Sequence, residues 1–164
     1  MSFEVGDAQD LPFPADRFDV VLCESVNTFV PDLDQAMREY VRVAKPGGFV
    51  ALNEAIWYEN PSEKAKRLME ELTGQRLRRP EEWMQALEQA GLSEIQARSY
   101  HVDMKTETRS QLGFLSMSEL LRIMWRSVRS LLTDPKTRDL VKLASQEPRE
   151  AYNYMGYGLY VGKV

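Results

Sequence analysis

Four polar side chains able to bind a ligand or take part in acid–base chemistry lie just after two predicted strands of this sequence. Glu24 and Asn27 follow the first strand, and Glu54 and Tyr58 follow the second. Ligands of open α/β sheets bind beyond the carboxyl ends of the strands, where neighbouring parallel strands bring such residues together. These four residues are therefore candidates for substrate contact, although helix capping or exposure to solvent explains any one of them equally well.

The elements that position these residues are a strand, a helix and a second strand. Residues 18–23 form a nearly continuous apolar run, which predicts a strand buried on both faces of a parallel sheet. An amphipathic helix is predicted to open at Pro31-Asp32 and to stop at Lys45-Pro46-Gly47-Gly48. Residues 49–53 then read as the next strand, and short loops between the three elements predict a right-handed crossover.

This unit carries a resemblance to a known family. The segments GDAQDLPFPADRFDVVLCESV and REYVRVAKPGGFVALNE resemble the second half of class I S-adenosylmethionine-dependent methyltransferases. The nearest group is the small-molecule one that includes quinone-biosynthesis and arsenite methyltransferases. The resemblance implies S-adenosylmethionine as cofactor, with the carboxylate of Asp7 accepting the adenine amino group and the backbone N–H of Ala8 meeting the ring. It places Glu24 and Ser25 along the methionine part. For an isolated Gly-Asp pair, a simple turn would be the better interpretation of Asp7.

The fold class implied is α/β, an incomplete Rossmann-like methyltransferase sheet with parallel strands and an antiparallel C-terminal strand. Residues 3–5 correspond to the family's third strand, and no Gly-rich turn follows a strand in the N-terminal part of the sequence. We therefore expect one truncated methyltransferase-like domain over residues 1–164, with impaired cofactor binding. A helical insertion is expected over residues 105–150, as a lid or an interaction surface.

The remaining elements follow from capping signals and periodicity. Helices are predicted from Asn60-Pro61, Pro80, Ser116 and Asp134-Pro135, and strands over residues 93–104 and 154–164. In the third of these helices, Arg122, Arg126 and Arg129 line the face opposite the apolar one. This row is either a solvated helix face, which we favour, or a site for an anionic ligand.

The resemblance also has a consequence for assembly. Without the family's first two strands, the strand at residues 18–23 is an apolar edge, which is an association hazard. Either the segment at residues 3–5 moves beside it or a second chain covers it. We therefore expect a homodimer, formed over this edge or by exchange of elements.

Composition excludes several function classes. The net charge of −4 argues against general nucleic-acid binding, and no apolar run is long enough to cross a membrane. One cysteine, Cys23, rules out an internal disulfide, and with no visible signal peptide this favours a cytoplasmic protein. One histidine, His101, cannot build a multi-histidine metal site, and no metal is expected. Methyl transfer from a sulfonium needs alignment rather than a catalytic triad.

Three functional hypotheses stay open. The first is a methyltransferase that acts on a small-molecule acceptor, either impaired here or completed by a partner. The second is a non-catalytic methyltransferase-like interaction or dimerisation module, and the third is a fragment without its own function. Fold does not fix the acceptor, and the arsenic chemistry of some relatives is disfavoured by the single cysteine.

Overall fold

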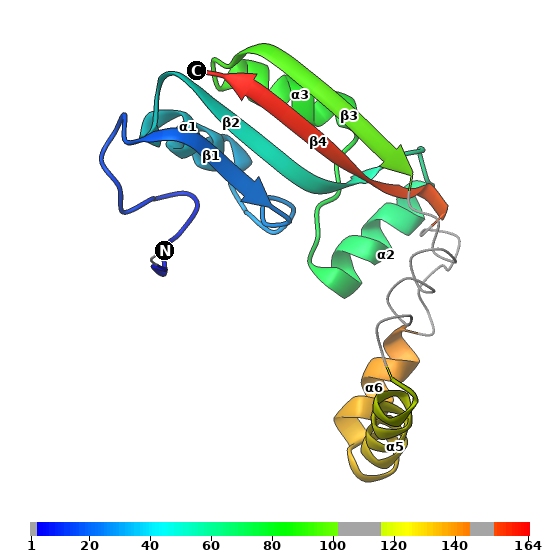
Figure 1. Cartoon of the computed structure of the whole chain (residues 1–164). Helices are drawn as coiled ribbons and strands as arrows, with labels where there is room; N and C mark the ends of the chain where they lie inside the picture. The colour runs from blue at the N-terminus through cyan, green and yellow to red at the C-terminus, as the bar shows by residue number, and fades with distance from the viewer. Residues whose placement is uncertain (1–2, 102–115, 145–152) are drawn as a thin grey trace.

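A sheet of four strands organises the computed structural model, which describes residues 3–101, 116–144 and 153–164. The strands are β1 (Phe18–Glu24), β2 (Ala44–Trp57), β3 (Ser93–His101) and β4 (Met155–Lys163). Their order is β1-β2-β4-β3, with β1 parallel to β2 and β4 antiparallel to both of its neighbours (Figure 1). This arrangement confirms the predicted Rossmann-like sheet with an antiparallel C-terminal strand.

The described helices are α1 (Leu33–Val43), α2 (Glu63–Thr73), α3 (Pro80–Gln89), α5 (Met117–Thr133) and α6 (Pro135–Ala144). Their boundaries follow local chemistry. The Asp32 side chain caps α1, a capping box joins Ser116 to Glu119 at the start of α5, and Gly74 takes the left-handed conformation (φ 73°) after α2.

Two predicted boundaries were wrong. Ser62, not Asn60, caps α2, because its side chain accepts a hydrogen bond from the backbone N–H of Ala65. Helix α1 ends at Val43, just before the predicted stop, but β2 begins at Ala44 instead of residue 49 and includes the Lys-Pro-Gly-Gly segment, in which Gly47 takes the left-handed conformation (φ 78°).

Helices α1 and α3 cover one face of the sheet, and the core lies between them and the strands (Figure 1). Alternate residues of β2 point into this core, where Val50, Leu52 and Ile56 are at most 1% exposed. On the helical side they meet side chains such as Met37 and Trp83. The period of two along the strand thus selects which side chains are buried.

The opposite face of the sheet is open. We use "open face" for its seven exposed large apolar residues, which the strand register joins across all four strands: Val20, Leu22, Phe49, Tyr100, Tyr157, Leu159 and Val161. The prediction that the strand at residues 18–23 is buried on both faces was therefore wrong. Among the described residues, helices pack on only one side of β1, and Leu22 stays 66% exposed.

The expected strand at residues 3–5 was also wrong. These residues have no regular secondary structure, and Phe3 and Val5 are almost fully exposed. A strand is stable only when its backbone groups pair with a neighbour, and no described strand lies beside this segment. Strand β1 is consequently an unpaired edge of the sheet, as predicted.

The predicted insertion contains α5 and α6, whereas residues 105–115 and 145–150 of it lie outside the described residues, as does the predicted strand end at residues 102–104. The two helices form a hairpin, fastened by a 2.8 Å hydrogen bond between the Ser130 and Thr137 hydroxyls, which projects away from the sheet (Figure 1). In the part of the chain that the structure describes, no helix is long and apolar enough to cross a membrane.

Candidate functional site

The carboxyl end of β1 and the middle of β2 hold a buried polar network. The Glu54 carboxylate is 1% exposed, and its Oε1 accepts hydrogen bonds from the Asn27 side-chain amide (2.9 Å) and from the backbone N–H of Asn27 (3.0 Å) and Val26 (3.3 Å). The Tyr40 hydroxyl, from α1, donates to Asn27 Oδ1 at 2.8 Å. Cys23 Sγ lies within this network, 3.1 Å from Asn27 Nδ2. These contacts tie the loop after β1 to the next strand.

Burial shifts the protonation of this network. It raises the pKa of the Glu54 carboxyl, and the hydrogen bonds from Asn27 and Val26 oppose that shift only in part. Burial likewise raises the pKa of the Tyr40 hydroxyl, with the Cys23, Glu54 and Asp7 charges acting in the same direction. Glu54 Oε2 is buried and has no hydrogen-bond partner among the described residues, which favours the protonated, uncharged form.

Two of the predicted substrate residues, Asn27 and Glu54, are therefore brought together but face each other inside the core. Both are at most 1% exposed. In this arrangement the pair holds the loop at residues 25–30 in place and does not reach solvent. A direct contact with substrate would require this loop to open.

The end of β1 presents a second, exposed group of polar side chains. Glu24 Oε1 accepts a 3.2 Å hydrogen bond from Asn53 Nδ2 on β2. Ser25 follows with φ 55°, a left-handed conformation that is uncommon for a residue other than glycine. Its backbone N–H donates to Asn53 O at 2.8 Å, so the strand ends in a sharp turn that exposes polar groups at the edge of the sheet.

Asp7 and Ala8 lie in a turn against α1. Asp7 Oδ1 accepts from the backbone N–H of Gln9 at 2.9 Å, whereas its Oδ2 makes only a 3.5 Å contact with Gln9 Nε2. The Gln9 side chain fastens the turn to the start of α1, because its Oε1 accepts from the backbone N–H of Asp32 at 2.9 Å. The Asp7 carboxylate is thus exposed, with one oxygen available to a ligand.

The segment that follows this turn is anchored by an ion pair on α1. Glu39 Oε2 accepts from the backbone N–H of Leu11 at 2.8 Å and pairs with Arg42 at 2.7 Å. Arg42 in turn donates to the backbone carbonyls of Leu11 and Phe13. The guanidinium of Arg42 lowers the pKa of the Glu39 carboxyl, so the anchor is charged at neutral pH.

Tyr58, the remaining substrate candidate, lies apart from the other three. It follows the last residue of β2 and is 41% exposed, with its ring 5.3 Å from that of His101 in an edge arrangement. His101 is also exposed, and its Nε2 lies 2.8 Å from the backbone oxygen of Asn153. The two rings border the point where β2, β3 and β4 end or begin, away from Asp7.

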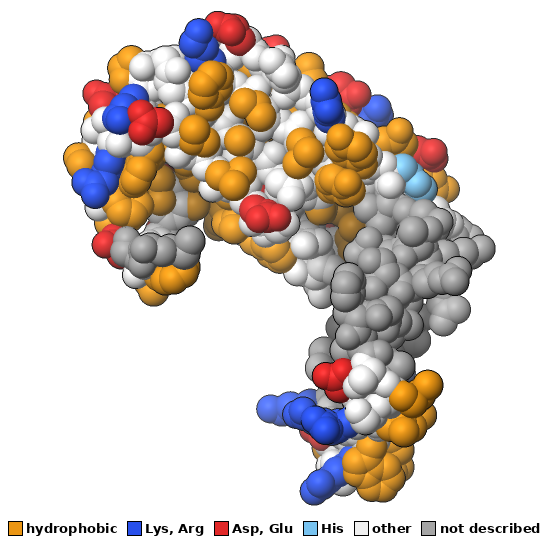
Figure 2. Space-filling view, viewed as in Figure 1, with side chains coloured by type: hydrophobic (Ala, Val, Ile, Leu, Met, Phe, Trp, Pro, Cys, Tyr) orange, Lys and Arg blue, Asp and Glu red, His pale blue; other side chains and the backbone are white. Residues whose placement is uncertain are grey.

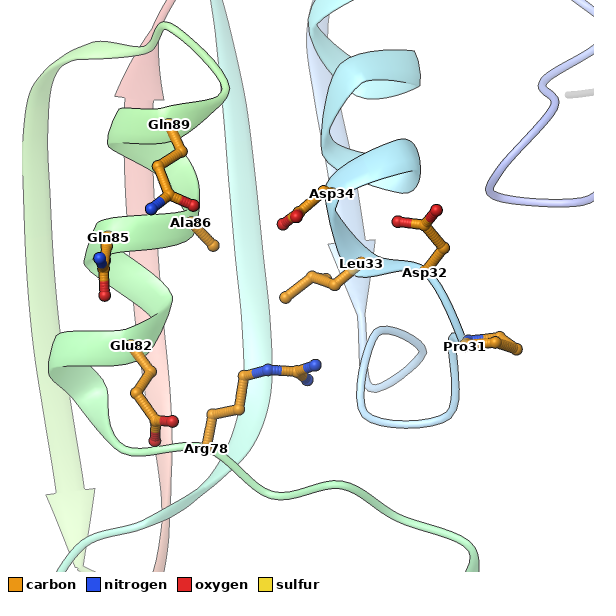
Figure 3. A pocket seen from close by; sticks show the side chains of 9 residues that line it. All are labelled: Pro31, Asp32, Leu33, Asp34, Arg78, Glu82, Gln85, Ala86 and Gln89. Atoms are coloured by element: carbon orange, nitrogen blue, oxygen red, sulfur yellow. The ribbon is translucent and has the colours of Figure 1, made fainter.

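A polar pocket of about 500 Å³ lies between the start of α1 and the outer side of α3 (Figure 3). The half-buried guanidinium of Arg78 extends across it from the segment before α3, facing Asp34 and Leu33 of α1. Burial lowers the pKa of Arg78, whose guanidinium also lies 5.3 Å from the centre of the Trp83 ring. The pocket is on the helical side of the sheet, and its mixed charges do not define a ligand class.

Sequence reasoning missed several of these residues. The predicted site residues do not include Gln9, Cys23, Tyr40, Asn53 or Arg78. The hydrogen bonds of Tyr40 to Asn27, of Asp32 to Gln9 and of Asn53 to Glu24 join positions 13, 23 and 29 residues apart, so no local sequence pattern predicts them. Among the described residues, no group of three or more His, Cys, Asp or Glu side chains could hold a metal ion.

Comparison with known sequences gives one family match. The "Methyltransferase domain" family model matches residues 1–52, which contain Asp7, Ala8, Glu24 and Ser25. Methyltransferase GfsG of Streptomyces halstedii is 39% identical over 56 residues, which are 34% of this chain and 20% of that protein. A probable tocopherol O-methyltransferase of Oryza sativa subsp. japonica is 26% identical over 151 residues, covering 82% of this chain and 41% of that protein.

Solved structures share the fold at low sequence identity. The [4+2]-cyclase SpnF has a TM-score of 0.68 and 21% identity, covering 98% of this chain and 54% of its own. Phosphoethanolamine N-methyltransferase 2 of Haemonchus contortus, in complex with S-adenosyl-L-methionine, has a TM-score of 0.62 and 20% identity, covering 96% of this chain and 35% of its own. The matched parts of the chain cover from about a fifth to about half the length of these proteins.

These matches confirm the resemblance to class I methyltransferases predicted from the sequence. The family match covers nearly all of the two segments that carry the resemblance, and the fold agrees with that of SpnF over nearly the whole chain. The same fold is shared by a cyclase, so the fold by itself leaves the reaction open.

Proposed function

We propose that this chain supplies one half of an S-adenosylmethionine site in a methyltransferase that acts on a small-molecule acceptor. The observation that carries the proposal is the match of residues 1–52 to a methyltransferase domain. The matched residues include the exposed turn at Asp7 and the exposed end of β1 at Glu24. Because the chain spans only part of its relatives, both the activity and the cofactor remain proposals for this chain.

The residues present fit one side of the cofactor. The exposed Oδ2 of Asp7, which has only a 3.5 Å contact with Gln9 Nε2, can accept a hydrogen bond from the adenine amino group, and the half-buried Ala8 is the next residue in the turn. Glu24 and Ser25 present polar groups beyond the carboxyl end of β1, which suits the charged methionine part. The sequence has no Gly-rich turn between a strand and a helix, so we expect weak binding by the isolated chain.

The cofactor, when bound, supplies a methyl group already activated by the positive sulfur. The residues of this chain then hold and orient it and contribute no covalent step. Asn27, Glu54 and Tyr58 remain proposed substrate-side residues. The buried Asn27–Glu54 pair would act by fixing the loop after β1, and Tyr58 by its exposed ring.

Isothermal titration with S-adenosylmethionine tests this function. The chain should bind in the high micromolar to millimolar range, and Asp7→Ala should weaken binding at least about tenfold, as expected for loss of one hydrogen bond to a charged group. Asp10→Ala removes an equal charge from the same turn and is the matched control. Absence of heat at millimolar cofactor, or equal weakening by both variants, would contradict the proposal.

A second candidate function, a non-catalytic interaction or dimerisation module, is favoured by the unpaired edge of β1 and the exposed open face. Both features lower the cost of association with another chain. We therefore also propose that the chain forms a homodimer. Light scattering after size-exclusion chromatography measures this directly, and a monomer at 100 µM would contradict it.

A further inference from the structure

A pocket of about 350 Å³ lies between α2 and the segment that leads to α3. We call it the cationic pocket and define it by its six charged lining residues: Glu63, Lys66, Arg67, Glu70, Arg76 and Arg78. Residues 63–79 carry six basic and three acidic side chains, whereas the whole chain has a net charge of −4. Positive charge is thus concentrated around one hollow of an acidic chain, which favours the binding of an anion.

Helix α2 and the turn after it build this pocket. The four lining residues on α2 are spaced by three and four positions, so they share one face of the helix. Gly74, with φ 73°, ends α2 and directs residues 75–78 back along that face. Trp57 and Met69 are at most 3% exposed and pack together with Leu77 beneath the charged side chains. The charged groups are therefore held above a buried apolar cluster.

The carboxylates of the cationic pocket leave part of its positive charge without a partner. Glu63 forms an ion pair with Lys66 at 2.8 Å. Glu70 pairs with Arg76, also at 2.8 Å. Arg67 forms no ion pair within the described ranges, and its charge acts with the hydrogen bond from Lys66 in lowering the pKa of the Glu63 carboxyl. A guanidinium presents a planar set of N–H donors that fits the oxygens of a carboxylate or a phosphate.

The cationic pocket borders the ligand edge of the sheet. Residues 76–78 run parallel to the end of β2, where Arg78 forms a β-bridge with Ile56. The backbone N–H of Arg76 donates to Thr28 O at 2.7 Å, in the loop that follows β1. The half-buried guanidinium of Arg78 extends toward α1 (Figure 3), so its charge lies behind the pocket. Since ligands of open α/β sheets bind beyond the carboxyl ends of the strands, the pocket is placed for a second ligand beside the cofactor.

The arginine row of α5 provides a contrast within the same chain. Arg122, Arg126 and Arg129 are exposed, and Figure 2 shows the basic side chains of the α5–α6 hairpin together on one of its sides. These side chains extend from the outer surface of a helix, where solvent screens each charge. An anion that is merely attracted to positive charge would bind the row as well as the pocket, so the row serves as an internal reference.

We infer that the cationic pocket binds an oxyanion, either a carboxylate or a phosphate group. Under the function proposed above, on which this part of the inference rests, the oxyanion belongs to the methyl acceptor. Arg67 and Lys66 donate to its oxygens, and Arg76 and Arg78 add positive charge from the other wall. The substrate class is thereby narrowed to small molecules that carry a negative charge.

A titration of the full chain with inorganic phosphate, followed by its backbone amide NMR signals, tests the inference without cofactor or acceptor. Phosphate should bind with a dissociation constant of about 1–10 mM and shift the amides of residues 66–67 and 75–78, while those of α5 stay in place. Sodium acetate, titrated in the same way, shows whether a carboxylate or a phosphate is preferred. Sodium chloride at equal ionic strength controls for screening.

Two substitutions on α2 should change phosphate binding in opposite directions. Arg67→Gln removes the cation without an ion-pair partner and should weaken binding at least about threefold. Glu63→Gln frees Lys66 from its carboxylate and should strengthen binding by a similar factor. Lys64→Gln is the matched control, because it removes a charge from the same helix at an exposed position outside the pocket, and it should leave binding nearly unchanged.

Three results would overturn the inference: shifts that do not saturate by about 50 mM phosphate, equal shifts along the arginine row of α5, or equal weakening by Arg67→Gln and Lys64→Gln. Competition between phosphate and S-adenosylmethionine would assign the pocket to the cofactor carboxylate and overturn its assignment to the acceptor. Phosphate binding by a chain that does not bind S-adenosylmethionine would confirm the oxyanion site and reject the proposed function, so the two failures are distinguishable.

Discussion

The two faces of the sheet are built from alternate residues of the same strands, yet their surroundings differ. Leu52 and Tyr160 point to the helical side and are at most 1% exposed, whereas their neighbours Ala51 and Val161 point to the open face, where Val161 is 39% exposed. Apolar composition is similar on the two sides. What distinguishes them is whether a helix packs on top, and α1 and α3 do so on one side only.

Apolar residues in a strand therefore indicate that a face can be buried, and they do not show that it is buried. On the covered face the apolar side chains are buried by helices of the same chain, together with the Glu54 network. On the open face the apolar side chains stay exposed and are available to pack against another element. Side chains on the covered face should therefore govern stability, and those on the open face should govern association.

The largest expected effect comes from a cavity on the covered face. Leu52→Ala should lower the free energy of unfolding by about 2–5 kcal/mol, because the buried side chain has no solvent to replace its contacts. Leu22→Ala, on the open face, should cost less than about 1 kcal/mol. Both are measured by urea denaturation at low micromolar protein concentration, where association contributes least. Equal losses would abolish the distinction between the two faces.

A second prediction concerns the pH dependence of the covered face. The pKa of Glu54 is raised on folding, so the folded chain binds more protons than the unfolded one at pH values above the ordinary pKa of glutamate. The contribution of Glu54 is then favourable at low pH and is lost as the pH rises through the raised pKa. Glu54→Gln should remove this loss, so that wild type and variant diverge as pH increases.

Unfolding free energies measured from pH 4.5 to 8 check this behaviour. Glu39 has a lowered pKa and acts in the opposite direction in both proteins, so the difference between wild type and variant isolates Glu54. A constant difference across this range would show that Glu54 is not protonated on folding.

The sequence predicted the covered side better than the open one. Helix ends were signalled by short-range chemistry, as with the Asp32 cap and the capping box of Ser116 and Glu119. The parallel pairing of β1 with β2 and the antiparallel C-terminal strand followed from the family resemblance. The interpretation of residues 18–23 as doubly buried was wrong because an apolar strand looks the same whether or not its second face is covered.

The candidate site was predictable only in part. Asp7, Glu24 and Ser25 were identified through the resemblance, and the structure leaves all three at exposed turns. The contact of Tyr40 with Asn27, in contrast, joins positions 13 residues apart through tertiary packing, and neither residue carries a local signal for it. Residues 3–5 failed as a strand because β propensity cannot replace a pairing partner.

A third, smaller effect is expected at the anchor between the acidic turn and α1. Arg42→Ala removes the donor that holds the Leu11 and Phe13 carbonyls and frees Glu39 from its partner. Amide hydrogen exchange at Leu11 should accelerate roughly tenfold while the β2 amides keep their protection. Arg38→Ala, on the same helix but bonded only to Gln35, is the control. Unchanged exchange at Leu11 would show that the turn is held by other contacts.

The smallest effect is expected at the exposed ion pair that joins Asp19 of β1 to Lys45 of β2. The Asp19 side chain is 84% exposed, and solvent screens its 2.8 Å contact with Lys45. Asp19→Asn should leave the thermal midpoint within experimental error. A clear decrease would show that this exposed ion pair contributes to the stability of the β1–β2 pairing.

Sedimentation of the wild-type chain and of Leu22→Glu tests the central claim, that the open face governs association whereas the covered face governs stability. Leu22 lies on the open face and is 66% exposed, whereas Leu52 lies on the covered face and is 1% exposed. The wild-type chain should dimerise at 100 µM, and Leu22→Glu should weaken the dimer at least about tenfold without lowering the free energy of unfolding of the monomer by more than about 1 kcal/mol. A dimer that Leu22→Glu leaves intact would contradict the account.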